Sequence, residues 1–218
     1  MNFTPRVSDI SHYEDVVDGG FIQAKNAGLW GIIQKCTQGV SYADGLYTVR
    51  KKEVKEAGLL FGSYHFNDGS NDAAQVDYYL SHADTQPDEL VALDYEDNPH
   101  SDMRPAQMVE FLHGIEDKLG RKAVLYSGNK IKEDIGRLGA EDQAYVVSHR
   151  LWLAQYGTVA HLPAGWEQYW IWQYTGDGIG PEPHWVPGIK ASGKGLDLNV
   201  YDGDQASFQA EWAAASND

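Results

Sequence analysis

The stretch Leu90-Val91-Ala92-Leu93-Asp94-Tyr95-Glu96 joins an apolar run to two carboxylates that stand one residue apart. Turn-forming residues bound the run, with Pro87-Asp88 before it and Asn98-Pro99 after it, so we expect a buried β-strand. Side chains alternate across a strand, and Asp94 and Glu96 are therefore expected on the same face. Removing carboxylates from water costs free energy, so two of them at the end of a hydrophobic strand are expected only where they have a use. This pair is therefore the first candidate for a functional site.

Seven further apolar runs resemble this one, and most of them end in polar or aromatic residues. The eight runs are residues 6–10, 29–36, 59–66, 90–96, 122–127, 150–156, 169–175 and 195–201. Helical patterns separate the early runs, because residues 46–57, 71–80 and 105–120 carry apolar side chains at helical spacing. Strands that alternate with helices form parallel sheets, and eight such strands predict a closed barrel.

The pattern changes after the sixth run. Residues 157–168 are too few for a full crossover helix, and residues 176–193 are rich in Gly and Pro. A closing helix is expected over residues 206–215. The predicted fold class is therefore α/β, a TIM-like barrel of eight mostly parallel strands whose last helices are missing.

Length and composition are those of one folded domain, which we expect to span residues 1–218. Hydrophobic residues make up 42% of the chain, yet no stretch reaches the length of a membrane helix, and residues 1–6 lack the apolar core of a signal peptide. The 17 basic and 32 acidic residues give a net charge of −15, which argues against nucleic-acid binding. Cys36 is the only cysteine and lies in an apolar run, so a buried, inert thiol is expected.

Barrels of this kind place their sites at the carboxyl ends of the strands. Residues at these ends are Asp9, Tyr64, His65, Phe66, Asp94, Glu96, Tyr126, Trp152, Tyr156, Gln173 and Tyr174, and Asp197 lies on the eighth run. Asp9 and Asp197 become neighbours when the barrel closes, so four carboxylates are expected at one mouth. Glycoside hydrolysis uses paired carboxyl groups, and aromatic rings stack on sugars, so this combination predicts a carbohydrate cleft. His65 alone fits a hydrogen-bonded core histidine better.

No metal or other cofactor is expected at this site. The carboxylates are not accompanied by a pair of histidines at ligand spacing, because His65, His149 and His161 are scattered singly. The chemistry is therefore expected to rest on carboxyl groups alone.

Several motifs together make the chain recognisable. They are Val7-Ser8-Asp9-Ile10-Ser11, residues 31–39, residues 57–66, Leu93-Asp94-Tyr95-Glu96, residues 151–156, Trp172-Gln173-Tyr174 and Asp197-Leu198-Asn199. Through the order, the spacing and the strand context of these motifs, the chain resembles glycoside hydrolase family 25, the muramidase-type lysozymes, along nearly its whole length. The resemblance implies a flattened (β/α)5(β)3 barrel. It also implies cleavage of the β-1,4 bond between N-acetylmuramic acid and N-acetylglucosamine in peptidoglycan.

The resemblance also implies roles for the candidate residues. Glu96 is expected to be the general acid, and Asp94 to stabilise the substrate's 2-acetamido group if that group attacks the anomeric carbon. Direct attack by water, with Asp94 or Asp197 as base, is the open alternative. Asp9 and Asp197 are expected to complete an acidic floor that raises the proton affinity of Glu96. The residues expected to form the sugar subsites are Tyr64, Tyr126, Trp152, Tyr156 and Gln173.

One departure from the family pattern stands out. The second-strand motif usually ends in Thr-Glu-Gly, whereas this chain has Thr37-Gln38-Gly39, which removes a carboxylate near the cleft. We expect no separate wall-binding domain, a monomer without nucleic-acid or membrane partners, and action on the cell wall outside the cell. Secretion, or release of a phage-encoded enzyme at lysis, would fit the lack of a signal peptide.

Three alternatives stay open from the sequence. The first is a chitinase-like glycosidase, which usually carries a further aspartate where this chain has Ala92. The second is a catalytically inactive sugar-binding barrel, whose signature would be loss of the acid, yet Glu96 is present. The third is a structural component of a lysis or virion assembly that kept the barrel.

Overall fold

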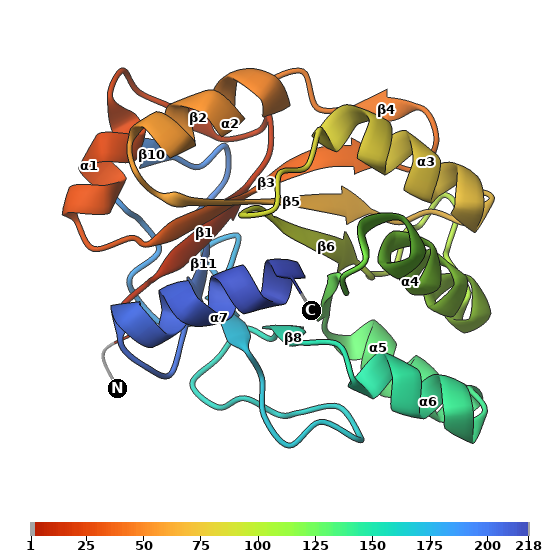
Figure 1. The fold of residues 1–218 in the computed structure, drawn as a ribbon. Coiled ribbons are helices and arrows are strands. Elements are labelled where there is room, and N and C mark those ends of the chain that lie inside the picture. Colours follow the sequence, from red (N-terminus) through yellow and green to blue (C-terminus); the bar gives the residue numbers. More distant parts are fainter. Residues whose placement is uncertain (1–2, 218) are drawn as a thin grey trace.

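In the computed structural model, which describes residues 3–217, eight strands close into a barrel (Figure 1). These strands are β1 (Val7–Ile10), β3 (Gly31–Gln38), β5 (Leu60–Phe66), β6 (Leu90–Asp94), β7 (Val124–Ser127), β8 (Leu151–Ala154), β9 (Ile171–Thr175) and β11 (Asp197–Val200). Each coincides with one of the eight apolar runs, so the predicted strands and the α/β barrel are confirmed. The strand expected over residues 90–96 is shorter in the structure: β6 ends at Asp94, and Glu96 lies in the loop that follows.

The strand directions explain how the barrel closes. From β1 through β3, β5, β6, β7 and β8 to β9, each strand runs parallel to the next. The last strand, β11, is antiparallel to both β9 and β1 and fills the gap between them. Short strands lie outside this ring: β4 (Tyr42–Ala43) extends β3, and β2 (Asp15–Val16) pairs with β10 (Ile189–Lys190). The chain thus forms five β/α units followed by three strands.

Helices cover the outside of the first strands. They are α1 (Gly20–Asn26), α2 (Tyr47–Glu56), α3 (Asp72–Ala83), α4 (Pro105–Leu119), α5 (Asn129–Asp134), the short 3₁₀ helix η1 (Ile135–Arg137), α6 (Ala140–Val147) and α7 (Gln205–Asn217). The capping signals act as expected: the Asn71 side chain accepts a hydrogen bond from the Ala74 backbone N–H at the start of α3. Gly120 ends α4 with a φ of 67°, a conformation that favours glycine.

Two hydrophobic layers hold the fold together. The outer layer lies between helices and strands, where Phe111 and Ile115 of α4 pack with Val76 and Tyr79 of α3. The inner layer fills the barrel and includes Val7, Ile33, Leu90, Ala92, Val124, Tyr126, Trp152, Trp170, Ile171, Phe208 and Trp212. The buried polar residues include Asp9, Asp94 and Gln173, near the carboxyl ends of the parallel strands.

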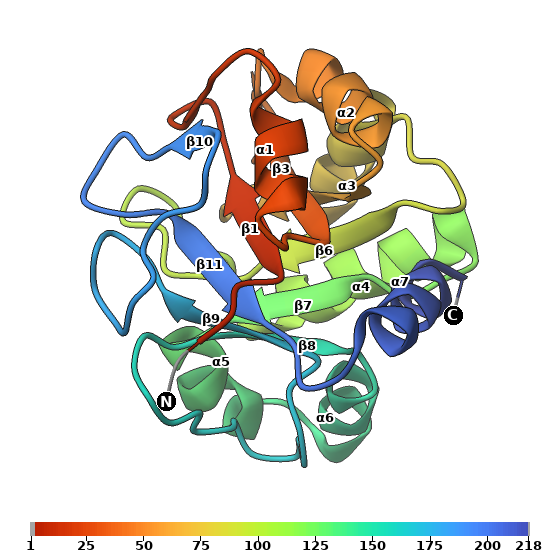
Figure 2. The ribbon, with the colours of Figure 1, turned by 90° about the vertical axis from the view of Figure 1, so that its left-hand side faces the viewer.

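The predicted closing helix, α7, seals one end of the barrel. Its Phe208 and Trp212 are buried against the amino ends of the strands, where a Cβ on Gly31 or Gly62 would lie 3.4 or 3.2 Å from the Trp212 ring. Figure 2 shows α7 on one side of the molecule and the long β9–β11 connection on the other. The open mouth is therefore at the carboxyl ends of the parallel strands.

Two expectations from composition can be compared with the fold. Cys36 is buried, and burial raises the pKa of its thiol to about 12, which confirms the predicted buried thiol. Within residues 3–217, none of the helices combines the length and the apolar character that a membrane span requires.

Candidate active site

A pocket of about 210 Å³ opens at the carboxyl ends of the strands. Its walls are formed by Asp9, Tyr64, Asp94, Glu96, Tyr126, Trp152, Tyr156, Asp177 and Asp197. The structure thus brings together all four carboxylates and four of the five aromatic or amide residues that the sequence selects. These residues come from β1, β5, β6, β7, β8, β11 and the loops that follow β6, β8 and β9.

Asp94 and Glu96 face the pocket from the same side, although only Asp94 belongs to a strand. Tyr95 between them points the other way into the outer core, where its hydroxyl donates to Asp134 Oδ2 at 2.7 Å. The side chains of Tyr95 and Glu96 therefore still alternate between the two faces, although β6 has already ended at Asp94. Asp94 is 8% exposed, and its Oδ1 is buried without a hydrogen-bond partner among the described residues. The described residues therefore leave this buried oxygen without a donor.

Asp9 is held by two amide groups. Asn199 Nδ2 donates to Oδ1 at 2.7 Å, and Gln173 Nε2 donates to Oδ2 at 2.8 Å. Gln173 in turn accepts a hydrogen bond of 2.8 Å from the Tyr126 hydroxyl. Gln173 is only 1% exposed and is not among the pocket-lining residues, so it supports Asp9 and Tyr126 instead of forming a subsite surface as expected.

The shape of the pocket depends on aromatic rings. Tyr126 and Trp152 meet edge to face, with ring centroids 4.5 Å apart. Trp152 Nε1 donates to Asn199 Oδ1 at 2.5 Å, which ties the ring to the same amide that binds Asp9. Tyr156 is 38% exposed and stands at the rim. The Trp152 and Tyr126 rings are almost fully buried, so of these three rings Tyr156 presents the most surface to a sugar.

Burial shifts four carboxyl groups of the pocket, those of Asp9, Asp94, Glu96 and Asp197, toward their neutral forms. Burial, followed by the charges of Asp9 and Asp97, raises the pKa of Glu96 to about 7. Burial raises the pKa of Asp9 to about 6 against the effect of its two amide donors. Burial and the charge of Asp9 raise the pKa of Asp197 to about 9.

The pKa of Asp94 is also raised, first by burial and then by the charge of Glu96. Lys35 opposes this shift because its ammonium group favours the ionised form of Asp94. The four carboxyl groups therefore share protons at neutral pH. A site with a protonated Glu96 beside an ionised Asp94 can combine proton donation with stabilisation of positive charge.

The Gln38 departure has a visible consequence for Lys35. Lys35 Nζ donates to Gln38 Oε1 at 2.8 Å and lies 4.9 Å from the centre of the Phe66 ring. Among the described residues, no carboxylate oxygen lies within the 4 Å of Nζ that defines an ion pair. The charge of Lys35 therefore interacts with the carboxyl group of Asp94. Lys35 on β3 pairs with Tyr64 on β5, which lines the same pocket as Asp94.

Other strand-end residues lie outside the pocket. His65 is fully buried: its Nδ1 lies 2.8 Å from Thr37 Oγ1 and its Nε2 lies 3.1 Å from Gln75 Oε1. Burial lowers the pKa of His65 to about 4, so the imidazole is neutral and the core-histidine interpretation is confirmed. Tyr174 likewise points away and donates to the Pro183 carbonyl at 2.9 Å.

Sequence reasoning missed two residues of the site. Asp177 lines the pocket from the β9–β11 connection and has a φ of 51°, and no apolar run marks its position. Gly176 provides space, because a Cβ there would lie 2.2 Å from Asp197 Oδ1 and 2.3 Å from the Tyr156 hydroxyl. A Gly before a polar residue in a Gly-rich loop was the only available signal.

A second pocket, of about 500 Å³, adjoins the first. Glu96 and Tyr156 line both pockets, and the second continues along Asp97, Gly128, Asn129, Lys130, Ala154 and Gln155. Glu96 therefore stands at the junction of two spaces, as required of a group that acts on the bond between two sugar units.

Comparisons with solved structures place this fold among known enzymes. A bacterial lysozyme from Streptomyces coelicolor is 23% identical, covers 98% of this chain and 100% of its own, and has a TM-score of 0.82. A muramidase from Acremonium alcalophilum is 26% identical, with 96% and 97% covered and a TM-score of 0.76. A muramidase from Trichobolus zukalii is 25% identical, with 99% of both chains covered and a TM-score of 0.76.

Sequence comparison leads to the same family. Curated protein sequences give no match to the chain. The profile described as Glycosyl hydrolases family 25 matches residues 8–182, which include three of the four carboxylates selected from the sequence, Asp9, Asp94 and Glu96. Since this match covers most of the chain and the barrel ends in a mouth of four carboxyl groups, the chain belongs to glycosyl hydrolases family 25.

Proposed function

We propose that this glycoside hydrolase is a muramidase that cleaves the β-1,4 bond between N-acetylmuramic acid and N-acetylglucosamine in peptidoglycan. The observation that carries the proposal is the place of Glu96. Its carboxyl group has a pKa raised to about 7, and Glu96 lines both pockets, one of which is also lined by aromatic rings and four further carboxyl groups. Family membership supports a glycosidic bond as the target.

Glu96 acts as the general acid in this proposal. At neutral pH a substantial fraction of Glu96 is protonated, and the proton passes to the glycosidic oxygen as the bond to the anomeric carbon breaks. The resulting carboxylate then accepts a proton from the water that completes hydrolysis. Burial is the main reason that the group holds its proton at the pH of the reaction.

Asp94 acts on the sugar whose bond is cleaved. Its unpartnered Oδ1 can accept the N–H of a 2-acetamido group, which orients the acetamido oxygen toward the anomeric carbon. Burial is the main cause of the raised pKa of Asp94; protonation of Glu96 removes the second cause, and the charge of Lys35 opposes the rest of the shift. Attack by the acetamido oxygen retains the anomeric configuration.

Fragment analysis tests the proposal. Purified peptidoglycan is digested, and the soluble fragments are examined by mass spectrometry; reducing-end muramic acid is expected. Reducing-end glucosamine would replace the muramidase assignment with a glucosaminidase. NMR of the first product should show the β anomer, because the α anomer would mean direct attack by water. A protein that releases no fragments and only binds glycan would support the inactive-barrel alternative.

The setting follows from the substrate. Peptidoglycan strands are the proposed partner, and the cell wall, outside the membrane, is the proposed place of action. We further propose that residues 3–217 work as one catalytic unit and as a monomer, since both pockets are formed by this chain alone. Sedimentation at working concentrations would check the oligomeric state.

A further inference from the structure

The position of Glu96 depends on more than the barrel. Strand β6 ends at Asp94, so the proposed acid lies on the loop between β6 and α4. Two backbone contacts fix the start of this loop: the Tyr95 N–H donates to the Tyr126 carbonyl at 2.9 Å, and Ser127 Oγ donates to the Tyr95 carbonyl at 2.6 Å. A third contact, from Asn67 Nδ2 to the Glu96 carbonyl at 3.0 Å, holds the backbone from the other side.

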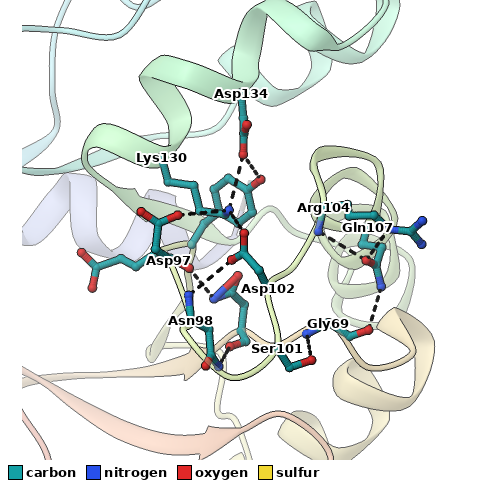
Figure 3. Close-up of polar contacts among 12 residues, drawn as sticks. Gly69, Asp97, Asn98, Ser101, Asp102, Arg104, Gln107, Lys130 and Asp134 are labelled. Atoms are coloured by element: carbon teal, nitrogen blue, oxygen red, sulfur yellow. Dashed lines mark hydrogen bonds and ion pairs between the residues drawn. The ribbon is translucent and has the colours of Figure 1, made fainter.

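Lys130 holds both chain neighbours of Glu96. Its ammonium nitrogen lies 4.9 Å from the centre of the Tyr95 ring and 3.4 Å from Asp97 Oδ1. It also lies 2.6 Å from Asp102 Oδ2, further along the same loop, and 3.5 Å from Asp134 Oδ2 on its own helix, α5. Figure 3 shows the three aspartates pointing toward Lys130 from two different segments.

The loop beyond Asp97 depends on the same lysine. Asp102 Oδ1 accepts a hydrogen bond from the Asn98 N–H at 3.3 Å, and Asn98 Nδ2 donates to the Asn67 carbonyl at 3.1 Å. Asn67 is the residue that binds the Glu96 carbonyl, so these contacts and the chain from Glu96 to Asn98 form a closed ring beside Glu96. Such a ring fixes a loop that no strand pairing supports.

Charge makes Lys130 difficult to replace. Its side chain is 7% exposed and faces three carboxylates, of which, within residues 3–217, only Asp134 has a second cationic partner, Arg137, at 2.6 Å. Burial disfavours the ammonium form, but the hydrogen bond and charge of Asp102, with the charges of Asp134 and Asp97, raise the pKa of Lys130 above its usual value. Lys130 therefore stays charged. Without it, Asp97 and Asp102 would repel each other and the loop would move.

We propose that Lys130 is a positioning residue for the reaction, which holds the Glu96 loop in place by binding Tyr95, Asp97 and Asp102 at once. This inference rests on the proposed role of Glu96 as the acid. Lys130 also lines the second pocket, but its ammonium group is engaged by carboxylates of this chain. Its effect therefore passes through Glu96.

The test compares Lys130→Met with Lys51→Met. Lys51 is a matched control, since its ammonium group is also mostly buried, at 15% exposure, and lies 2.7 Å from Glu89. Neither Lys51 nor Glu89 lines a pocket that contains Glu96. Both variants are expected to melt below the parent. Only Lys130→Met should lower kcat, by about 10-fold to 100-fold with little change in KM, because misplacement of a catalytic group by about 1 Å has effects of this size.

The pH profile separates positioning from simple loss of stability. Loss of the Lys130 charge leaves Asp97 uncompensated beside Glu96, so the alkaline limb of kcat/KM should move to higher pH in Lys130→Met and stay unchanged in Lys51→Met. Lys130→Arg keeps the charge and should recover most of the kcat. If Lys130→Met and Lys51→Met lose the same stability and share the parent's kcat and pH profile, the proposal is overturned.

A second variant covers the case in which Lys130→Met does not fold. Asp102 is half exposed, so Asp102→Asn should fold while it weakens the shortest contact of Lys130. We expect a several-fold loss of kcat, and an unchanged kcat would contradict the inference. Fragment analysis of the parent enzyme tests the muramidase proposal separately, since its outcome does not depend on either lysine variant.

Discussion

Asp9 on β1 lies directly opposite Asp197 on β11, at the seam where the first and last strands pair antiparallel. The pairing places a carboxylate from each end of the chain at the same mouth. Asn199, two residues after Asp197, donates to Asp9, so the seam that closes the barrel also builds the acidic floor. The same strand pairing, β1 with β11, therefore closes the barrel and brings Asp9, Asp197 and Asn199 together.

Replacement of the proposed acid should separate activity from folding. Glu96→Gln keeps the shape of the side chain but removes the transferable proton, so the rate on peptidoglycan should fall by about 10²- to 10⁴-fold. Asp94→Asn should also be severe, because it removes the negative charge at the anomeric centre. Release of reducing ends and the melting temperature are measured for each variant. A Glu96→Gln protein with near-parent activity and the parent's melting temperature would exclude Glu96 as the acid.

Activity should decline as the pH rises through about 7. The pKa of Glu96 is raised to about 7, chiefly by burial, and only the protonated form can donate to the leaving oxygen. The check is kcat/KM for a soluble glycan between pH 4 and 9. An activity that stays constant to pH 9 would contradict the assignment, since an ionised Glu96 has no proton to give.

The same shifts predict that stability falls with rising pH. The folded-state pKa values of Asp9, Glu96 and Asp197 are raised to about 6, 7 and 9 from their ordinary values of 3.8, 4.5 and 3.8. Between the unfolded and folded values the folded protein holds more protons, so unfolding becomes easier as the pH rises from about 4 to about 9. Asp197→Asn should make the dependence of melting temperature on pH shallower. An equally steep dependence in this variant would show that Asp197 keeps its proton affinity on unfolding.

Lys35 should control the acid limb of the activity profile. Its charge lowers the pKa of Asp94, so Lys35→Met should raise that pKa and move the acid limb to higher pH. Gln38→Glu would place a carboxylate beside the ammonium group and should act in the same direction, but less strongly. Lys52, which is 74% exposed on α2, provides the control variant Lys52→Met, whose profile should match the parent. A Lys35→Met profile that overlays the control would remove Lys35 from the site.

Gly176 should tolerate no side chain. A methyl group there would overlap Asp197 Oδ1 and the Tyr156 hydroxyl, so Gly176→Ala should lower kcat/KM by about 10-fold to 100-fold through displacement of these groups. Gly136→Ala is the matched control, because a Cβ at Gly136 meets nothing within 4 Å. The control should keep full activity. Equal activity in both variants would mean that the loop can move aside.

Much of the fold could be read from local pattern. The eight strands were predictable because each is a short apolar run bounded by Gly, Pro or polar residues, and α4 because Pro105 and Gly120 mark its ends. The pair Asp94 and Glu96 was predictable for the same reason, since alternation along one strand is a local property. The ring of acids followed from one rule, that the carboxyl ends of barrel strands meet at one mouth.

The sequence by itself therefore determined the barrel, its missing last helices and the pocket residues that lie on or directly after strands β1 to β8 and on β11. Only the tertiary structure decided that β11 runs antiparallel, that Gln173 lies behind Asp9, and that Asp177 and Gly176 belong to the site. It alone showed Lys130 bound to both neighbours of Glu96. The physical reason is range: periodicity and capping act over a few residues, whereas the Lys130–Asp97 and Gln173–Asp9 contacts join side chains 33 and 164 positions apart, whose meeting depends on how the whole barrel closes.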